Sequence, residues 1–273
     1  MTRLATGGLI DRNQPIRFRF DGRTLTGFAG DSLASALLAN GVRIVGRSFK
    51  YHRPRGILTD GIDEPNALVT LHSGARTDPN CRAPSVALFD GLEAHSQNCW
   101  PSPNFDLMAV NGLFSKIFVA GFYYKTFMWP AALWERLYEP LIRRAAGLGR
   151  LSGQPDPDHY DRSHAFADML VVGSGIAGLS AALAAARDGR RVLLVENDEQ
   201  LGGRLLSERH EVDGHSGADW VAAAQRELAA NSQVTVLTRT SLFGAYDGKS
   251  FAAVERVSEH LSATANGQPR QRY

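Results

Sequence analysis

The residues best suited to do chemistry in this chain form a glycine-rich turn, Gly173-Ser174-Gly175-Ile176-Ala177-Gly178. The turn matches G-x-G-x-x-G and lies between a predicted buried strand at 168–172 and a predicted helix at 179–187. Gly173 allows a tight strand-to-helix turn, Gly175 lets the backbone approach a pyrophosphate, and Gly178 lets helix and strand pack closely. The helix N-terminus offers unpaired N–H groups and a positive dipole end to phosphate. The pattern predicts a dinucleotide site.

An acidic residue follows the next predicted strand, 191–195, where such sites hold the ribose. Glu196 can accept hydrogen bonds from both hydroxyls of an adenosine ribose and would repel a 2′-phosphate, which disfavours NADP. A strand–helix–strand unit without a ligand is the alternative interpretation. The histidines show no metal-ligand spacing, so no metal site is predicted. No catalytic residue can be named from the sequence.

Further contacts are predicted beyond Glu196. Asn197 and Asp198 continue its loop, and Gly202-Gly203-Arg204 follows. A Gly-Gly pair here is typical of flavoproteins in which the loop passes close to the dinucleotide. Arg204 either pairs with the pyrophosphate or faces solvent, and we favour the phosphate. A further strand at 234–237 leads toward Leu242, whose backbone is expected near the adenine.

The N-terminal part predicts a small α+β domain. Alternation of apolar and charged residues at 16–20, followed by Asp21-Gly22, indicates a strand and a two-residue hairpin turn. A helix is expected to begin with Asp31 as its N-cap and to end at Gly41. Further short strands are expected at 67–71 and 85–89.

An aromatic-rich segment follows at 101–150, with Pro130 at a predicted helix start and a helix at 131–144 bent near Pro140. These aromatic residues either pack the domains together or form a subunit interface. A polar linker is predicted at 152–158. The aromatic residues are Phe105, Phe114, Phe118, Phe122, Tyr123, Tyr124, Phe127, Trp129, Trp134 and Tyr138.

The composition describes a globular protein of one or two domains, with 273 residues, 44% hydrophobic, 21% charged and a net charge of +2. That charge is too small to indicate nucleic-acid binding. Cys81 and Cys99 are too few for a four-thiolate iron–sulfur cluster. They indicate reduced thiols in a reducing, cytoplasmic compartment, and a single disulfide is the alternative. The uncharged stretch 169–186 is better explained by a strand, a glycine turn and a small-residue helix than by a membrane span.

The chain resembles the alpha subunits of heterotetrameric sarcosine oxidases along essentially all of its length. The matching segments are Gly46-Arg47-Ser48-Phe49-Lys50-Tyr51-His52-Arg53-Pro54-Arg55-Gly56, Glu64-Pro65-Asn66-Ala67, residues 120–130 and the glycine fingerprint. The resemblance implies a plant-type ferredoxin-like (β-grasp) first domain that lacks its cluster, because the loop 41–61 has no cysteine. The basic run from Arg43 to Arg55 is a solvated surface, or it meets an acidic partner or a flavin phosphate.

The resemblance also implies cofactors and partners. The alpha subunit would hold a tightly bound NAD, sarcosine would be oxidised at FAD in a beta subunit, and electrons would pass to FMN at the alpha–beta boundary. Oxygen would become hydrogen peroxide, with glycine and formaldehyde, or methylene-tetrahydrofolate, as the other products. Small gamma and delta subunits would complete the heterotetramer. The predicted cofactor-binding residues are Gly173, Ser174, Gly175, Ala177, Gly178, Glu196, Asn197, Asp198, Gly203, Arg204 and Leu242, with Asp198 and Arg204 departing from the family's usual residue types.

We therefore predict three regions: a cluster-less ferredoxin-like domain at 8–100, an aromatic-rich helical segment and linker at 101–166, and the first part of a Rossmann-type FAD/NAD(P)-binding domain at 167–273. Because later strands normally complete such a domain, the chain is expected to be truncated, inactive alone and weak in binding NAD. Two alternatives are a subunit of a related FAD-dependent proline, opine or glycine dehydrogenase, and a non-catalytic assembly module with a structural nucleotide.

Overall fold

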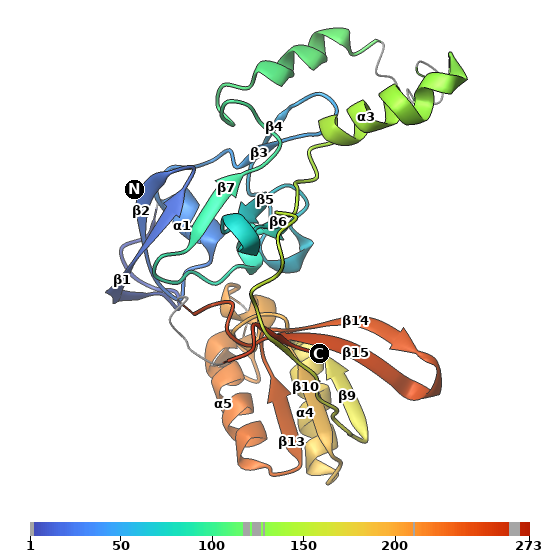
Figure 1. The fold of residues 1–273 in the computed structure, drawn as a ribbon. Coiled ribbons are helices and arrows are strands. Elements are labelled where there is room, and N and C mark those ends of the chain that lie inside the picture. The colour runs from blue at the N-terminus through green and yellow to red at the C-terminus, as the bar shows by residue number, and fades with distance from the viewer. Residues whose placement is uncertain (1–2, 117–120, 122–126, 128, 210, 262–267) are drawn as a thin grey trace. The chain divides into compact units, whose positions relative to one another are not determined.

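The computed structural model describes residues 3–116, 121, 127, 129–209, 211–261 and 268–273 (Figure 1). The chain divides into two compact units, Met1–Ala5 with Leu9–Pro157 and Thr6–Gly8 with Asp158–Tyr273. Each unit has its own core of buried apolar side chains. Among the described residues, no helix has both the length and the apolar character that a membrane crossing requires.

The first unit is built on a five-stranded sheet with the order β2-β1-β7-β5-β6, in which β1 and β7 are parallel and the other neighbours antiparallel. Helix α1 (Leu33–Ala39) packs its buried Leu33 and Leu37 into the same core as Phe18 and Val69. The sheet strands are β1 (Asp11–Phe20), β2 (Arg23–Ala29), β5 (Leu68–Leu71), β6 (Asp78–Arg82) and β7 (Glu93–Ser96), and a separate ladder pairs β3 (Gly46–Arg47) with β4 (Pro54–Arg55).

Three local predictions in this unit are confirmed. Asp21 and Gly22 both have positive φ, 48° and 76°, as the two central residues of a hairpin turn between β1 and β2 require. Gly41 follows α1 with φ +77°, in the left-handed conformation that ends helices. The strand expected at 67–71 is β5.

Two other local predictions are wrong. Ser32, not Asp31, is the N-cap of α1, since its side chain accepts the Ser35 N–H. Asp31 lies one position earlier and its carboxylate instead accepts the Phe28 N–H at 2.8 Å. No strand forms at 85–89 either, because the chain makes a 3-10 turn at Ala83–Ser85 and β7 begins only at Glu93. Pro84 favours that turn, since proline has no N–H to donate to a ladder.

The segment after β7 is helical but not one continuous helix. A 3-10 helix, η4 (Leu107–Phe114), is followed by η5 (Ala131–Leu133), the π-helical turn η6 (Trp134–Tyr138) and α3 (Glu139–Ala145). Pro140 lies in the first turn of α3, directly after the π-helical turn η6, so the hydrogen-bonding pattern of the helix changes beside the proline, where the sequence predicts a bend. Trp129 is 83% exposed, so it is not part of the core. Phe118, Phe122, Tyr123 and Tyr124 of the predicted aromatic band lie outside the described residues.

The second unit contains a three-stranded parallel sheet with the order β13-β10-β9 (Figure 1). Helices α4 and α5 pack against each other and against this sheet, burying Leu179, Leu194 and Leu228. Strand β9 is an edge of the sheet, and its Val172 is 57% exposed. The bounds are β9 (Met169–Val172), α4 (Ile176–Arg187), β10 (Val192–Val195), α5 (Gly217–Ala230) and β13 (Val234–Leu237).

A second sheet in this unit has the order β14-β15-β16-β8, and a short hairpin pairs β11 with β12. These strands are β8 (Tyr160–Asp161), β11 (Glu211–Val212), β12 (His215–Ser216), β14 (Thr240–Tyr246), β15 (Ser250–Arg256) and β16 (Gln271–Arg272). The remaining short helical turns of the chain are η1 (Gly61–Asp63), η2 (Gly74–Arg76), η3 (Ala83–Ser85), η7 (Gly203–Leu206) and η8 (Asp247–Lys249).

A buried carboxylate organises the loop before β5 in the first unit. Glu64 is 1% exposed, and its two oxygens accept four backbone N–H groups, from Leu58, Thr59, Asn66 and Ala67, at 2.6–3.1 Å. Burial raises the pKa of Glu64, but the four N–H donors outweigh it and hold the pKa below the ordinary value of 4.5. The carboxylate is therefore charged at neutral pH and fixes the loop backbone.

We expect Glu64→Gln to lower the free energy of unfolding at pH 7 by roughly 2 kcal/mol or more, because an amide leaves backbone N–H groups without an acceptor. A carboxylate with a depressed pKa stabilises the fold above its unfolded pKa and loses that contribution as pH falls through the folded pKa. The difference between the two proteins should thus shrink below pH 4.5. Urea unfolding at several pH values measures it, with Asp63→Asn as control. A pH-independent difference would contradict this role.

Candidate functional site

The glycine turn joins β9 to α4, and each glycine meets a different steric demand. Gly173 has φ +88°, a conformation that side-chain-bearing residues rarely adopt. A Cβ on Gly178 would lie 1.9 Å from the Gly173 carbonyl oxygen, so only glycine lets α4 pack this closely on the turn. A Cβ on Gly175 would meet nothing within 4 Å. The turn is therefore closed at Gly178 and open at Gly175, on the side where a ligand would approach.

The N-terminus of α4 is available to an anion. Gly175 is its N-cap residue, and no side chain caps the helix there. The first N–H groups of a helix have no intrahelical acceptor and carry the positive end of the helix dipole. Ile176 and Ala177, in this first turn, are exposed. The first turn can therefore donate backbone N–H groups to a phosphate beside Gly175.

Glu196 lies at the carboxyl end of β10 and is joined to the turn through Ser174. Its Oε2 accepts the Ser174 backbone N–H at 2.7 Å and the Ser174 hydroxyl at 2.5 Å, and its Oε1 accepts the Asp198 N–H at 2.9 Å. Ser174 is fully buried and Glu196 is 8% exposed. A carboxylate has about four acceptor positions. Three are used here, which leaves a position on Oε1 for a ribose hydroxyl.

The Gly-Gly loop completes the same end of the sheet. The Gly202 N–H is within 3.1 Å of both the carbonyl and the hydroxyl oxygen of Ser174. A Cβ on Gly203 would lie 3.5 Å from the Cα of Gly175, so the loop passes beside the turn as predicted from the sequence. The Arg204 side chain, however, is 89% exposed and its guanidinium pairs with Glu208.

An arginine that the sequence analysis did not single out holds the loop after Glu196. The Arg256 guanidinium donates to the backbone oxygen of Asn197, to its amide oxygen at 3.3 Å and to the Ser241 hydroxyl at 3.4 Å. Burial lowers the pKa of Arg256. Leu242 follows on β14 and is partly buried. Arg256 ends β15 far along the chain and belongs to no motif, so no sequence signal could have identified it.

These contacts bring most of the predicted residues to one end of the parallel sheet. Gly173, Ser174, Gly175, Glu196 and Gly203 are linked by hydrogen bonds or close backbone approach, and Ala177 lies in the first helical turn. Asn197 is held by the Arg256 guanidinium, and the backbone N–H of Asp198 donates to Glu196. Among the described residues, no group of three or more histidine, cysteine, aspartate or glutamate side chains could hold a metal ion.

Comparison with known proteins gives a consistent result. Residues 13–99 match the family described as 2Fe-2S iron-sulfur cluster binding domain, and residues 168–258 match FAD dependent oxidoreductase. The chain is 57% identical over 270 residues to sarcosine oxidase subunit alpha of Rhizobium meliloti (strain 1021), and 35% identical over 271 residues to that of Corynebacterium sp. (strain U-96). These matches cover 99% and 97% of this chain but 27% and 23% of the relatives, so it spans about a quarter of their length.

Among solved structures, the L-proline dehydrogenase from P. horikoshii is similar, with a TM-score of 0.52 and 17% identity over 89% of this chain and 37% of that chain. At this identity the likeness concerns the fold alone. The expected ferredoxin-like first domain and the oxidoreductase character of the second region are confirmed by the family matches.

Two glycine substitutions should separate the steric roles within the turn. Gly178→Ala should lower the free energy of unfolding by about 1–3 kcal/mol, because its Cβ would clash with the Gly173 carbonyl. Gly175→Ala should change it by less than about 0.5 kcal/mol, since the site has room and an ordinary φ of −63°. Urea unfolding of both variants tests this, and equal losses would show that the turn is closed at both positions.

Proposed function

This chain belongs to the sarcosine oxidase alpha-subunit family along the residues that it covers, and on that premise we propose that its second unit binds a dinucleotide. The observation that carries the proposal is the open position at Gly175, beside an uncapped helix N-terminus and a buried carboxylate. A nucleotide bound there would lay its pyrophosphate along Gly175 and Ala177 and its adenosine ribose against Glu196. When bound, such a group supplies redox capacity or structural support.

The chain's own residues determine which dinucleotide fits. The free position on Glu196 accepts a ribose hydroxyl, and its negative charge would repel a 2′-phosphate. Ser174 keeps the carboxylate at the strand end, while Arg256 keeps Asn197 and Ser241 together beside it. We propose NAD as the nucleotide, and FAD as the alternative because the region matches FAD dependent oxidoreductases.

For the whole protein we propose the reaction of its relatives, the alpha subunits of sarcosine oxidase. The complex would demethylate sarcosine to glycine, with formaldehyde or methylene-tetrahydrofolate and hydrogen peroxide as the other products. Beta, gamma and delta subunits would complete a cytoplasmic heterotetramer that also contains FAD and FMN. The residues described here would bind and orient a nucleotide in it, and the atoms that react with the amine would lie in other parts of the complex.

We also propose that the first unit carries no iron–sulfur cluster, although it matches a family named for one. The chain has only two cysteines, and a 2Fe–2S cluster of the ferredoxin type needs four thiolates. Cys81 and Cys99 are both partly buried, and neither forms a disulfide in the part of the chain that the structure describes. Glu64 instead gathers the backbone N–H groups of the loop at 58–67.

The nucleotide content of the purified complex tests the site. Gly175→Ala should reduce the nucleotide retained per chain at least tenfold, because its Cβ would occupy the space proposed for the pyrophosphate. The nucleotide is released by heat and identified by its absorbance and chromatographic mobility, which also distinguishes NAD from FAD. Gly112→Ala is the matched control, because a Cβ on Gly112, in the first unit, would lie an ordinary 3.9 Å from the Tyr51 carbonyl oxygen. Unchanged retention in Gly175→Ala would rule out binding at the turn.

A second measurement tests the role of the carboxylate. Glu196→Gln should lower the preference for NAD over its 2′-phosphorylated form about tenfold, equivalent to ~1.4 kcal/mol, because the repulsive charge is removed. Titration of nucleotide-free complex with both nucleotides gives this ratio, and a ratio is insensitive to a uniform loss of affinity. If the preference stays the same, Glu196 does not face the ribose.

A further inference from the structure

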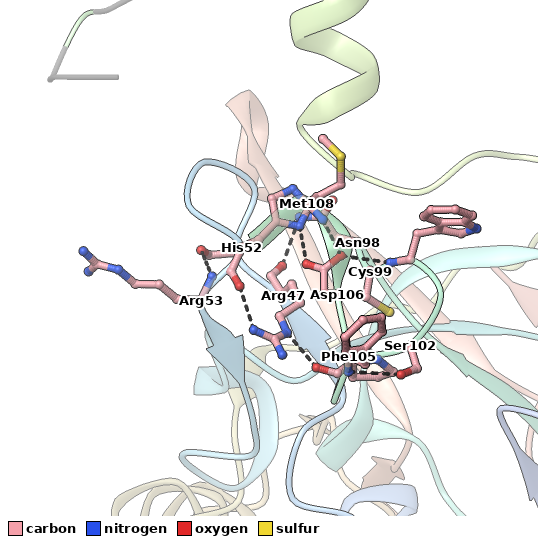
Figure 2. Close-up of polar contacts among 12 residues, drawn as sticks. Arg47, His52, Arg53, Asn98, Cys99, Ser102, Phe105, Asp106 and Met108 are labelled. Atoms are coloured by element: carbon pink, nitrogen blue, oxygen red, sulfur yellow. Dashed lines mark hydrogen bonds and ion pairs between the residues drawn. The ribbon is translucent and has the colours of Figure 1, made fainter. Parts of the chain in front are cut away.

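The first unit contains a buried imidazole with one unsatisfied nitrogen. His52 is 3% exposed, and its Nδ1 lies 2.7 Å from Oδ2 of Asp106, whose side chain is fully buried (Figure 2). Nε2 is buried and has no hydrogen-bond partner among the described residues. Leaving a buried polar atom without a partner is costly, so native proteins rarely do so without a reason.

Asp106 is held so that it serves the imidazole. Its other oxygen, Oδ1, accepts the Trp100 N–H at 3.0 Å and the Met108 N–H at 3.3 Å. The carboxylate is thereby fixed at the start of η4, where its Oδ2 can accept a hydrogen bond from Nδ1 of His52. With the hydrogen on Nδ1, the Nε2 atom of a neutral ring carries a lone pair and can accept a hydrogen bond from a ligand.

The backbone at His52 adopts the left-handed conformation and is held by hydrogen bonds to neighbouring groups. His52 has φ +51°, a conformation that residues other than glycine seldom adopt. Its N–H donates to the Ser48 carbonyl at 3.0 Å, and its own carbonyl accepts Nη1 of Arg47 at 2.9 Å. The same guanidinium donates to the Pro103 carbonyl at 2.6 Å. Arg47 is thus a structural residue within the basic run. Residues with unusual backbone conformations are found often at ligand sites.

His52 lines a cavity of about 1480 Å³ within the first unit, whereas Asp106 does not. The carboxylate therefore lies behind the ring, and the ring borders the cavity. Phe49, Trp100 and Tyr138 contribute aromatic surface to its wall. Small-molecule cavities are typically about 300–1,000 Å³, so a small ligand would occupy only the part of this one beside His52.

The charged side chains around the cavity are mostly cationic. Lys50, Arg144 and Arg150 line it, and Glu139, the one carboxylate among its described lining residues, is paired with Arg143 at 2.5 Å. Cys99 also lines the cavity, but burial raises the pKa of its thiol, so it is protonated at neutral pH and a poor nucleophile. The site is therefore suited to a ligand that stacks on the aromatic wall, donates one hydrogen bond to His52 and places a negative charge near the basic side chains.

We propose that this cavity is a second ligand site, in which His52 Nε2 accepts a hydrogen bond from the N–H or O–H of a planar aromatic acid. The aromatic body lies against the apolar wall, and the acidic group lies among the basic side chains of the 143–150 segment. The proposal rests on the first unit alone and does not depend on nucleotide binding by the second.

The probe 8-anilino-1-naphthalenesulfonate carries an aromatic body, an N–H donor and an acid, and N-phenyl-1-naphthylamine is its neutral counterpart. Fluorescence titration of the full chain and of the assembled complex should show one binding site for the sulfonate. Its affinity for the sulfonate should be at least tenfold higher than its affinity for the neutral probe. In His52→Asn the new asparagine tolerates the left-handed backbone, and the affinity for both probes should fall at least tenfold. Arg144→Gln should weaken only the sulfonate, and His164→Asn, at an exposed position, should change neither.

A measurement on the unmutated protein tests the same contact without depending on whether the His52→Asn variant folds. In protein with 15N-labelled histidine, the His52 ring is identified by its slowly exchanging Nδ1–H, and its Nε2 resonance should move when the sulfonate saturates the site. A stationary Nε2 resonance, or equal binding by folded His52→Asn, would overturn the proposal. Loss of the site in the assembled complex would also overturn it, because a partner chain would then fill the cavity.

Discussion

The hydrogen bonds between Ser174 and the buried carboxylate of Glu196 are the contact on which the ligand end of the second unit depends. A buried charge is tolerated only when hydrogen bonds replace its lost hydration. Here the same serine that satisfies Glu196 also accepts the Gly202 N–H, so the ends of β9 and β10 and the Gly-Gly loop are held at fixed separations by one side-chain pair. The hydrogen bonds of Ser174 thereby fix the positions of the backbone segments around the open space at Gly175.

The first unit uses the same principle at two places. Glu64 collects four backbone N–H groups, and Asp106 collects two together with an imidazole. The Glu64 carboxylate fixes the irregular backbone of the loop before β5, whereas the Asp106 carboxylate caps η4 and holds the Trp100 N–H. Of the residues that Asp106 contacts, His52, Trp100 and Met108 line the cavity.

The sequence was most informative where a single residue type answers a local backbone demand. The turn at Asp21-Gly22, the helix end at Gly41 and the steric roles of Gly173 and Gly178 were predicted correctly, because positive φ or the absence of a Cβ restricts those positions to few residues. It failed where two candidates compete, as with Asp31 and Ser32 for the N-cap, and where Pro84 favours a turn over a strand. It gave no sign of Arg256 beside Asn197, or of Asp106 behind His52, because these pairs are 59 and 54 positions apart and only the tertiary fold brings them together.

The edge position of β9 has a consequence for the surroundings of the glycine turn. The strand is Met-Leu-Val-Val, a short apolar run of high β-propensity, and among the described residues only β10 pairs with it. An unpaired strand edge of this kind is a template for the backbone of another chain. Any strand that paired with this edge would lie beside the glycine turn, because Val172 directly precedes Gly173, and its backbone would then form part of the surroundings of Gly175.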